Sequence, residues 1–356
     1  MTPGAEPVYI AALGACTPVG RDALSSAAAV RAGISGFVQH PYMIDTAGEP
    51  MRAAIAPWLD IDLQGLERFE ALLFPAIDQA LESVAGDAGA KLRIGLALGL
   101  PSTRPGLPAD IGKALRAAIA ERYPNRFVAQ ALLECGHAAG LLGMHATVRK
   151  MAAGVFDACI VAGVESYLAP ETLEWLEGND QLHSAGPLNN AWGFIPGEAA
   201  GAALLVTDHA LARLGVVPLG RVLGVGQGFE ENRIKTETVC IGEGLTTAFR
   251  EALSALPPDA KVTDVYCDMN GEPYRADEFG FAALRTKEAF VSASDFIAPA
   301  DCWGDVSAAS GPLALLLSTM ASQKAYANGP LTFVWGSSET GERGAALLAM
   351  PAAERQ

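Results

Sequence analysis

The chain has 356 residues, half of them hydrophobic and 18% charged, and its net charge at pH 7 is −15. Nucleic-acid binding needs clustered Lys and Arg, and the sequence contains no basic run, so we expect no nucleic-acid partner. No basic amphipathic stretch is present, and no apolar run approaches the ~18 residues of a membrane helix, so we expect no membrane role either.

The six cysteines are widely scattered and form no CxxC pair. We therefore predict free thiols, with neither a zinc site nor a redox motif, and no cofactor. No Lys or Arg precedes Arg21, so the charged start of a signal peptide is absent. These features predict a soluble, cytoplasmic protein.

Strand-like and helix-like segments alternate along the sequence. In chain order the first elements are a strand (7–20), a helix (21–33), a strand (93–100), two helices (110–123 and 138–154), a strand (156–165) and a strand with a short helix (201–215). The alternation then begins again, with a strand (219–229), a helix (242–256), a strand (261–269), a helix (307–322) and a closing hairpin (331–350).

Several of these strands are apolar on both faces, which is typical of sheets covered by helices. The sequence thus predicts an α/β protein of two similar halves, residues 1–212 and 213–356. A short glycine-rich stretch, "GVGQG" (224–228), follows a strand as a dinucleotide loop would. It lacks the full GxGxxG spacing, and we interpret it as an ordinary turn.

Longer motifs carry a family resemblance. "GVFDACIVAGVES" (154–166) resembles the G-x-x-D-x-x-x-A-G-G-x-E stretch of β-ketoacyl-acyl-carrier-protein synthases. "GPLNNAWGFIPGEAAGAALLV" (186–206) resembles their G-F-x-x-G-E-G-A-G segment, and "WGDVSAASGPLALL" (303–316) resembles the G-N-T-S-A-A-S segment of the type III enzymes. The opening strand with "RAGISG" and the closing "GSSETGERGAALL" match as well, so five matches occur in the family order.

This resemblance implies the thiolase-like superfamily, with a duplicated α/β/α/β/α five-layer fold and a homodimer. It also implies a catalytic Cys at the N-terminus of a buried helix, where backbone N–H groups lower the thiol pKa and bind an oxyanion. Two residues of the second half, His and His or His and Asn, would stabilise the carbanion.

The residues at these positions depart from the family pattern. The family Cys lies about 17 residues before the glycine that is Gly154 here, which places His137 at the nucleophile position. Cys135 lies two residues early, and we interpret it as a structural thiol. In the second half, Asn270 or Met269 occupies the position of the first His.

Asp305 occupies the last position, where its negative charge would oppose a carbanion. No histidine follows His209. The sequence therefore predicts a catalytically degenerate, non-condensing protein that binds an acyl chain or serves as an accessory subunit. Its expected partners are a second copy, an acyl thioester, an acyl carrier protein or another subunit.

An active acyltransferase is the alternative. His137 or Cys135 would then accept an acyl group from a thioester, and Asn270 and Asp305 would position or activate the acceptor. A scaffold with a collapsed pocket is a third interpretation.

Overall fold

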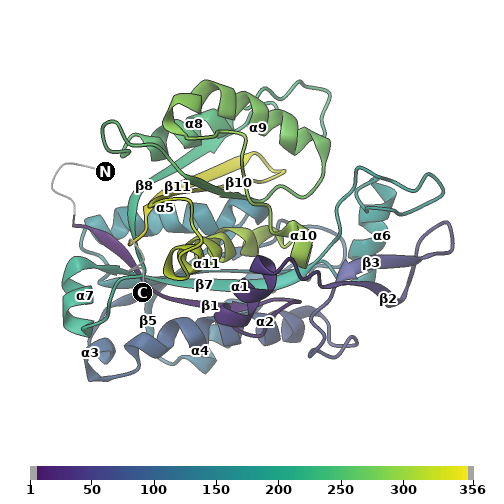
Figure 1. Ribbon diagram of the computed structural model, residues 1–356. Coiled ribbons are helices and arrows are strands. Elements are labelled where there is room, and N and C mark those ends of the chain that lie inside the picture. Colours follow the sequence, from purple (N-terminus) through teal and green to yellow (C-terminus); the bar gives the residue numbers. More distant parts are fainter. Residues whose placement is uncertain (1–5, 352–356) are drawn as a thin grey trace.

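The computed structural model describes residues 6–351 (Figure 1). The strands are β1 (Val8–Cys16), β2 (Phe37–Ile44), β3 (Pro50–Ala54), β4 (Ile94–Leu100), β5 (Phe127–Glu134), β6 (Ala158–Ser166), β7 (Glu198–Thr207), β8 (Gly220–Phe229), β9 (Asp264–Cys267), β10 (Leu331–Ser337) and β11 (Glu342–Ala349). The helices are α1 (Ala23–Arg31), α2 (Gly65–Leu81), α3 (Asp87–Ala90), α4 (Ile111–Arg122), α5 (Ala139–Ala152), α6 (Pro170–Gly178), α7 (Asp208–Leu214), α8 (Glu243–Leu253), α9 (Pro273–Thr286), α10 (Ala300–Trp303) and α11 (Ser310–Gln323).

Nine strands form one mixed sheet in the order β5-β4-β6-β7-β1-β8-β11-β10-β9. The two halves of the chain each contribute one side of it, and they meet where Val8, Tyr9 and Ile10 of β1 pair with β8. Counted outward from this junction, β1-β7-β6-β4 and β8-β11-β10-β9 follow the same topological order. The first half adds β5 at its outer edge.

Helices cover both faces of each half-sheet, and the layers are visible in Figure 1. Helices α5 and α11 contact strands of both half-sheets and form the central layer. Helices α2 and α4 cover the outer face of the first half-sheet, and α8 and α9 cover that of the second. The predicted layered α/β fold is confirmed.

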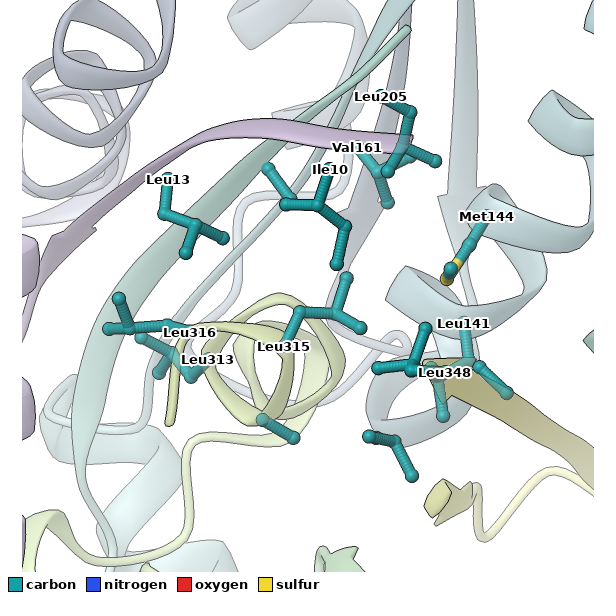
Figure 2. Close-up of a cluster of buried hydrophobic side chains, with 14 of the residues drawn as sticks. Ile10, Leu13, Leu141, Met144, Val161, Leu205, Leu313, Leu315, Leu316 and Leu348 are labelled. Atoms are coloured by element: carbon teal, nitrogen blue, oxygen red, sulfur yellow. The ribbon is translucent and has the colours of Figure 1, made fainter. Parts of the chain in front are cut away.

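The central layer is apolar because α11 is buried around most of its circumference. Figure 2 shows Leu313, Leu315 and Leu316 of α11 near Ile10 and Leu13 of β1. The same core includes Leu141 and Met144 of α5. This packing holds the N-terminal turns of α5 and α11 close together, with residues 136–138 contacting residues 307–309.

Some expectations from the sequence are wrong or incomplete. "GVGQG" is not a turn but the interior of β8. A Cβ atom at Gly224, Gly226 or Gly228 would collide with the backbone of α8, so glycine lets this helix lie directly on the strand. The sequence reading also missed α2, β5, α6, α9 and the β2–β3 hairpin.

The boundary predicted after residue 212 falls inside α7 and stays a prediction. Within the described residues, no helix is both long and apolar enough to cross a membrane.

Candidate active site

A tight turn carries His137 from the end of β5 to the start of α5. Gly136 has a φ of 74°, a left-handed conformation that glycine adopts at little cost. A Cβ atom there would also approach the Ser307 hydroxyl. His137 follows in a single 3₁₀ turn and is buried.

Asp305 reaches the same place from the second half. It follows α10 and Gly304, whose φ is 74°. The backbone N–H of Gly197 donates to the Asp305 carbonyl at 2.9 Å, and a Cβ atom on Gly197 would collide with the Trp303 carbonyl. The Gly197 of the sequence motif therefore positions the loop that carries Asp305.

Three of the four predicted site residues meet in space. His137 Nε2 lies 2.9 Å from Asp305 Oδ2 and 3.0 Å from Oδ1. Asn270, which follows β9, donates from Nδ2 to Asp305 Oδ2 at 2.6 Å. The backbone N–H of Ser307 donates to Oδ1 at 2.8 Å. The alternative position Met269 takes no part in these hydrogen bonds.

Arg275, in the first turn of α9, belongs to this site and was missed by the sequence analysis. Its Nη2 lies 3.1 Å from His137 Nε2 and 3.4 Å from Nδ1. Its Nη1 donates to Asp268 Oδ2 at 3.2 Å and to the Ser337 carbonyl at 2.9 Å. No motif marks an arginine at this position, so only the fold could reveal it.

Asp305 is ionised in this environment. Burial raises its pKa, but the His137 contact, the Arg275 charge and the Asn270 hydrogen bond outweigh burial and hold the pKa well below its usual range. The carboxylate only accepts hydrogen bonds, and therefore offers no donor to a developing negative charge.

Both ring nitrogens of His137 are engaged. Because Nε2 faces both oxygens of an ionised carboxylate, this nitrogen carries the hydrogen and donates it. Arg275 Nη2 lies 3.1 Å from Nε2 and 3.4 Å from Nδ1, so its guanidinium lies against both ring nitrogens. A nucleophile or base needs a free lone pair, so this arrangement does not favour attack on an acyl group.

A second ring of charges extends the cluster toward the surface. Glu272 accepts from Asn270 Nδ2 at 3.0 Å and from the Tyr274 hydroxyl at 2.5 Å. Lys235 lies 3.0 Å from Glu272 and 2.7 Å from Glu339. These contacts tie the loop carrying Lys235 to the charged centre.

Cys135, the fourth predicted residue, stands apart. None of the hydrogen bonds of the His137 cluster involves its thiol. Burial, and secondarily the charge of Glu342, raises the pKa of the Cys135 thiol to about 12. The thiolate is the reactive form, so this cysteine is a poor nucleophile near neutral pH.

The space beside Asp305 is small. A cavity lined by Asp268, Trp303, Gly304 and Asp305 has a volume of about 10 Å³. That is room for about one water molecule, and not for an acyl chain.

Glu198, from the same motif as Gly197, forms a second buried cluster in the first half. Arg68 Nε lies 2.6 Å from Glu198 Oε2, and Nη2 lies 2.8 Å from Oε1. The Ser166 hydroxyl and the Ala56 N–H donate to the same carboxylate. All of these contacts are internal, so the motif glutamate has a structural role.

A group of potential metal ligands lies elsewhere. One ligand atom each of Glu230, Cys240 and Glu278 lies within 4.8 Å of the others. Arg343 already binds Glu278 at 2.6 Å and compensates its charge.

Comparison with known proteins agrees with this architecture. Residues 132–210 match the family model of the β-ketoacyl synthase N-terminal domain. A search of curated protein sequences found no match.

Among solved structures, the chain is similar to the ketosynthase of a type II polyketide synthase in complex with its acyl-carrier protein. The TM-score is 0.78 at 13% identity, covering 98% of this chain and 100% of that one. For the ishigamide ketosynthase/chain length factor the TM-score is 0.70 at 20% identity, covering 97% and 99%.

The ketosynthase from module 6 of the bacillaene synthase of Bacillus subtilis 168 gives a TM-score of 0.77 at 15% identity, covering 97% of this chain and 72% of that one. The chain therefore has the thiolase-like fold of these ketosynthases, and residues 132–210 resemble the β-ketoacyl synthase N-terminal domain.

Proposed function

We propose that the chain is a non-condensing, ketosynthase-like accessory subunit. The observation that carries the proposal is the set of contacts around His137, whose Nε2 lies 2.9 Å from Asp305 while the Arg275 guanidinium lies against both ring nitrogens. Condensation needs a nucleophile that accepts an acyl group and donors that stabilise the carbanion. At this site the nitrogens are engaged and the opposing side chain is an ionised acceptor.

The small cavity beside Asp305 supports an accessory role over acyl-chain binding at this position. One of the similar structures is a ketosynthase/chain length factor, and this likeness supports a role for the chain beside another protein. The acyltransferase alternative has less support, because neither Cys135 nor His137 presents an activated nucleophile.

Intact-protein mass spectrometry after incubation with an acyl thioester tests the proposal. We expect no acyl adduct on the wild-type chain. If slow acylation occurs through the alternative route, the His137→Ala variant loses it and the Cys135→Ala variant retains it. A stable adduct on Cys135 contradicts both the assignment of His137 to the nucleophile position and the proposal.

The expected partner is a second copy of the chain. Strand β5 pairs only with β4 among the described residues, and its other edge is free. Val128 on this strand is 58% exposed. Free edges that carry apolar residues favour pairing with another strand, and antiparallel pairing of two β5 strands across a twofold axis would satisfy both copies.

Light scattering should therefore report about twice the 36.9 kDa of one chain. A charge on the edge strand, as in Val128→Lys, should shift the protein toward monomer. Val217, 80% exposed outside the helices and strands, supplies the matched control, Val217→Lys. A wild-type monomer at micromolar concentration contradicts this part of the proposal.

A further inference from the structure

A cavity of about 310 Å³ lies beside the edge strand β9 and shares no lining residue with the His137 cluster. Its apolar wall consists of Val30 from α1, Leu317 from α11 and Ile297. Sites for small organic ligands typically occupy about 300–1,000 Å³ and combine apolar walls with a few polar groups. The cavity meets this description, so its polar groups indicate what it accepts.

Tyr266 of β9 supplies one of these groups. The residue is only 2% exposed, yet it lines the cavity, and its hydroxyl has no hydrogen-bond partner among residues 6–351. Burial, reinforced by Asp264, raises the pKa of Tyr266, so the hydroxyl remains a donor. The hydroxyl opens into the cavity, so it can donate there to an acceptor of a bound ligand.

Arg31, the last residue of α1, supplies a charge. Its guanidinium lies over the ring of Tyr326, with Cζ 4.5 Å from the centroid. It forms no ion pair within the described part of the chain. In a protein of net charge −15, this arginine remains available to an anion.

Asp264 is the one carboxylate in the lining, and its oxygens are already used. Oδ1 accepts from the backbone N–H and the side-chain amide of Asn328. Oδ2 accepts from the Thr263 hydroxyl and the Gly329 N–H. With four donors bound, Asp264 has little capacity left for an incoming ammonium group.

We propose that this cavity binds a small amphipathic carboxylate. The carboxylate would accept from Arg31 and from the hydroxyl groups of Tyr266 and Tyr326, and its apolar body would pack on Ile297 and Leu317. The unpartnered polar groups offered by these residues are donors, and charged acceptors form the strongest hydrogen bonds with them. This site is independent of the proposed accessory function.

Three probes that share one apolar body test the head-group preference: 3-phenylpropionate, 3-phenylpropanol and 3-phenylpropylamine. Binding to the full chain is measured by isothermal titration calorimetry. We expect the carboxylate to bind at least about tenfold more tightly than the alcohol, which corresponds to one charge-assisted hydrogen bond. Equal binding of carboxylate and alcohol, or tighter binding of the amine, overturns the proposal.

Two variants place the binding in this cavity. Tyr266→Phe removes only the hydroxyl, and Arg31→Gln removes an exposed charge, so each should weaken 3-phenylpropionate binding about tenfold. The matched controls Tyr42→Phe and Arg116→Gln, both at exposed residues outside the cavity, should leave Kd unchanged. No carboxylate binding at millimolar concentration, or binding that Arg31→Gln leaves intact, contradicts the assignment.

Discussion

Two of the buried charge clusters in this protein, the one at Glu198 and the one at Arg275, are built differently. Arg68 and Glu198 form a pair in which both carboxylate oxygens meet the guanidinium and further donors complete the set. Around Arg275, carboxylates outnumber the Arg and Lys side chains, and Asp268 Oδ1 and Arg275 Nε have no hydrogen-bond partner in the described structure.

A fully partnered pair is expected where a motif serves stability, because an unpaired buried charge is costly. Incompletely partnered polar groups are more typical of sites retained for another reason. The difference fits a structural role for the motif that contains Glu198, and it fits the proposal that the site around His137 does not condense acyl groups.

The largest expected effect comes from breaking the complete pair. Arg68→Ala leaves the Glu198 carboxylate buried without its counter-ion, and should lower the free energy of unfolding by about 3–5 kcal/mol. Urea denaturation measures this loss. Arg116→Ala, at an exposed residue of α4, is the control and should change stability by no more than about 0.5 kcal/mol. If Arg68→Ala costs no more stability than Arg116→Ala, the Arg68–Glu198 pair does not stabilise the fold as proposed.

Asp305→Asn should have a smaller effect. It weakens hydrogen bonds to a charged group but also removes one of the excess carboxylates, so we expect a loss of about 1.5–3 kcal/mol at pH 7. Urea denaturation at neutral pH measures it.

The pH dependence of the stability of Asp305→Asn tests whether Asp305 is ionised in the folded protein. Because the pKa of Asp305 is lowered in the folded state, its contribution is complete above the unfolded value of about 3.9 and is lost as pH falls toward the folded pKa. The stability difference between wild type and Asp305→Asn should therefore shrink between pH 5 and about pH 3. A constant difference over that range would mean that Asp305 is not held ionised by its neighbours.

The smallest effect concerns the thiols. Burial raises the pKa of Cys135 to about 12 and those of Cys16, Cys159 and Cys240 to about 11, and it also raises the pKa of Cys267 and Cys302. A thiol reagent at pH 8 should thus react slowly with the folded protein. All six cysteines should react after denaturation. Rapid reaction of Cys135 in the folded state would indicate an activated thiol and break the account of the site.

The layered fold could be predicted because the segments with the clearest apolar patterns in the sequence are strands and helices of the buried core. The apolar strands β4, β6, β7 and β10 and the small-residue helix α5 have patterns that tertiary packing does not override. The sequence missed β5 and α9, whose exposed faces carry mixed residues. It misread "GVGQG" because the need for glycine comes from α8 lying on the strand, which is a contact between separate elements.

Motif spacing also predicted His137, Asn270 and Asp305, and they converge as their positions required. Arg275 could not be found this way. Its role depends on where the first turn of α9 lies relative to α5, and residues 275 and 137 are far apart in the sequence.

The central claim is that the chain does not condense acyl groups, and a product assay tests it most directly. The wild-type protein is incubated with an acyl thioester and a malonyl thioester, and β-ketoacyl thioester is measured by mass spectrometry against a reaction without protein. The account predicts no product above that background. Product formed by the wild type and lost in His137→Ala or Cys135→Ala would contradict it.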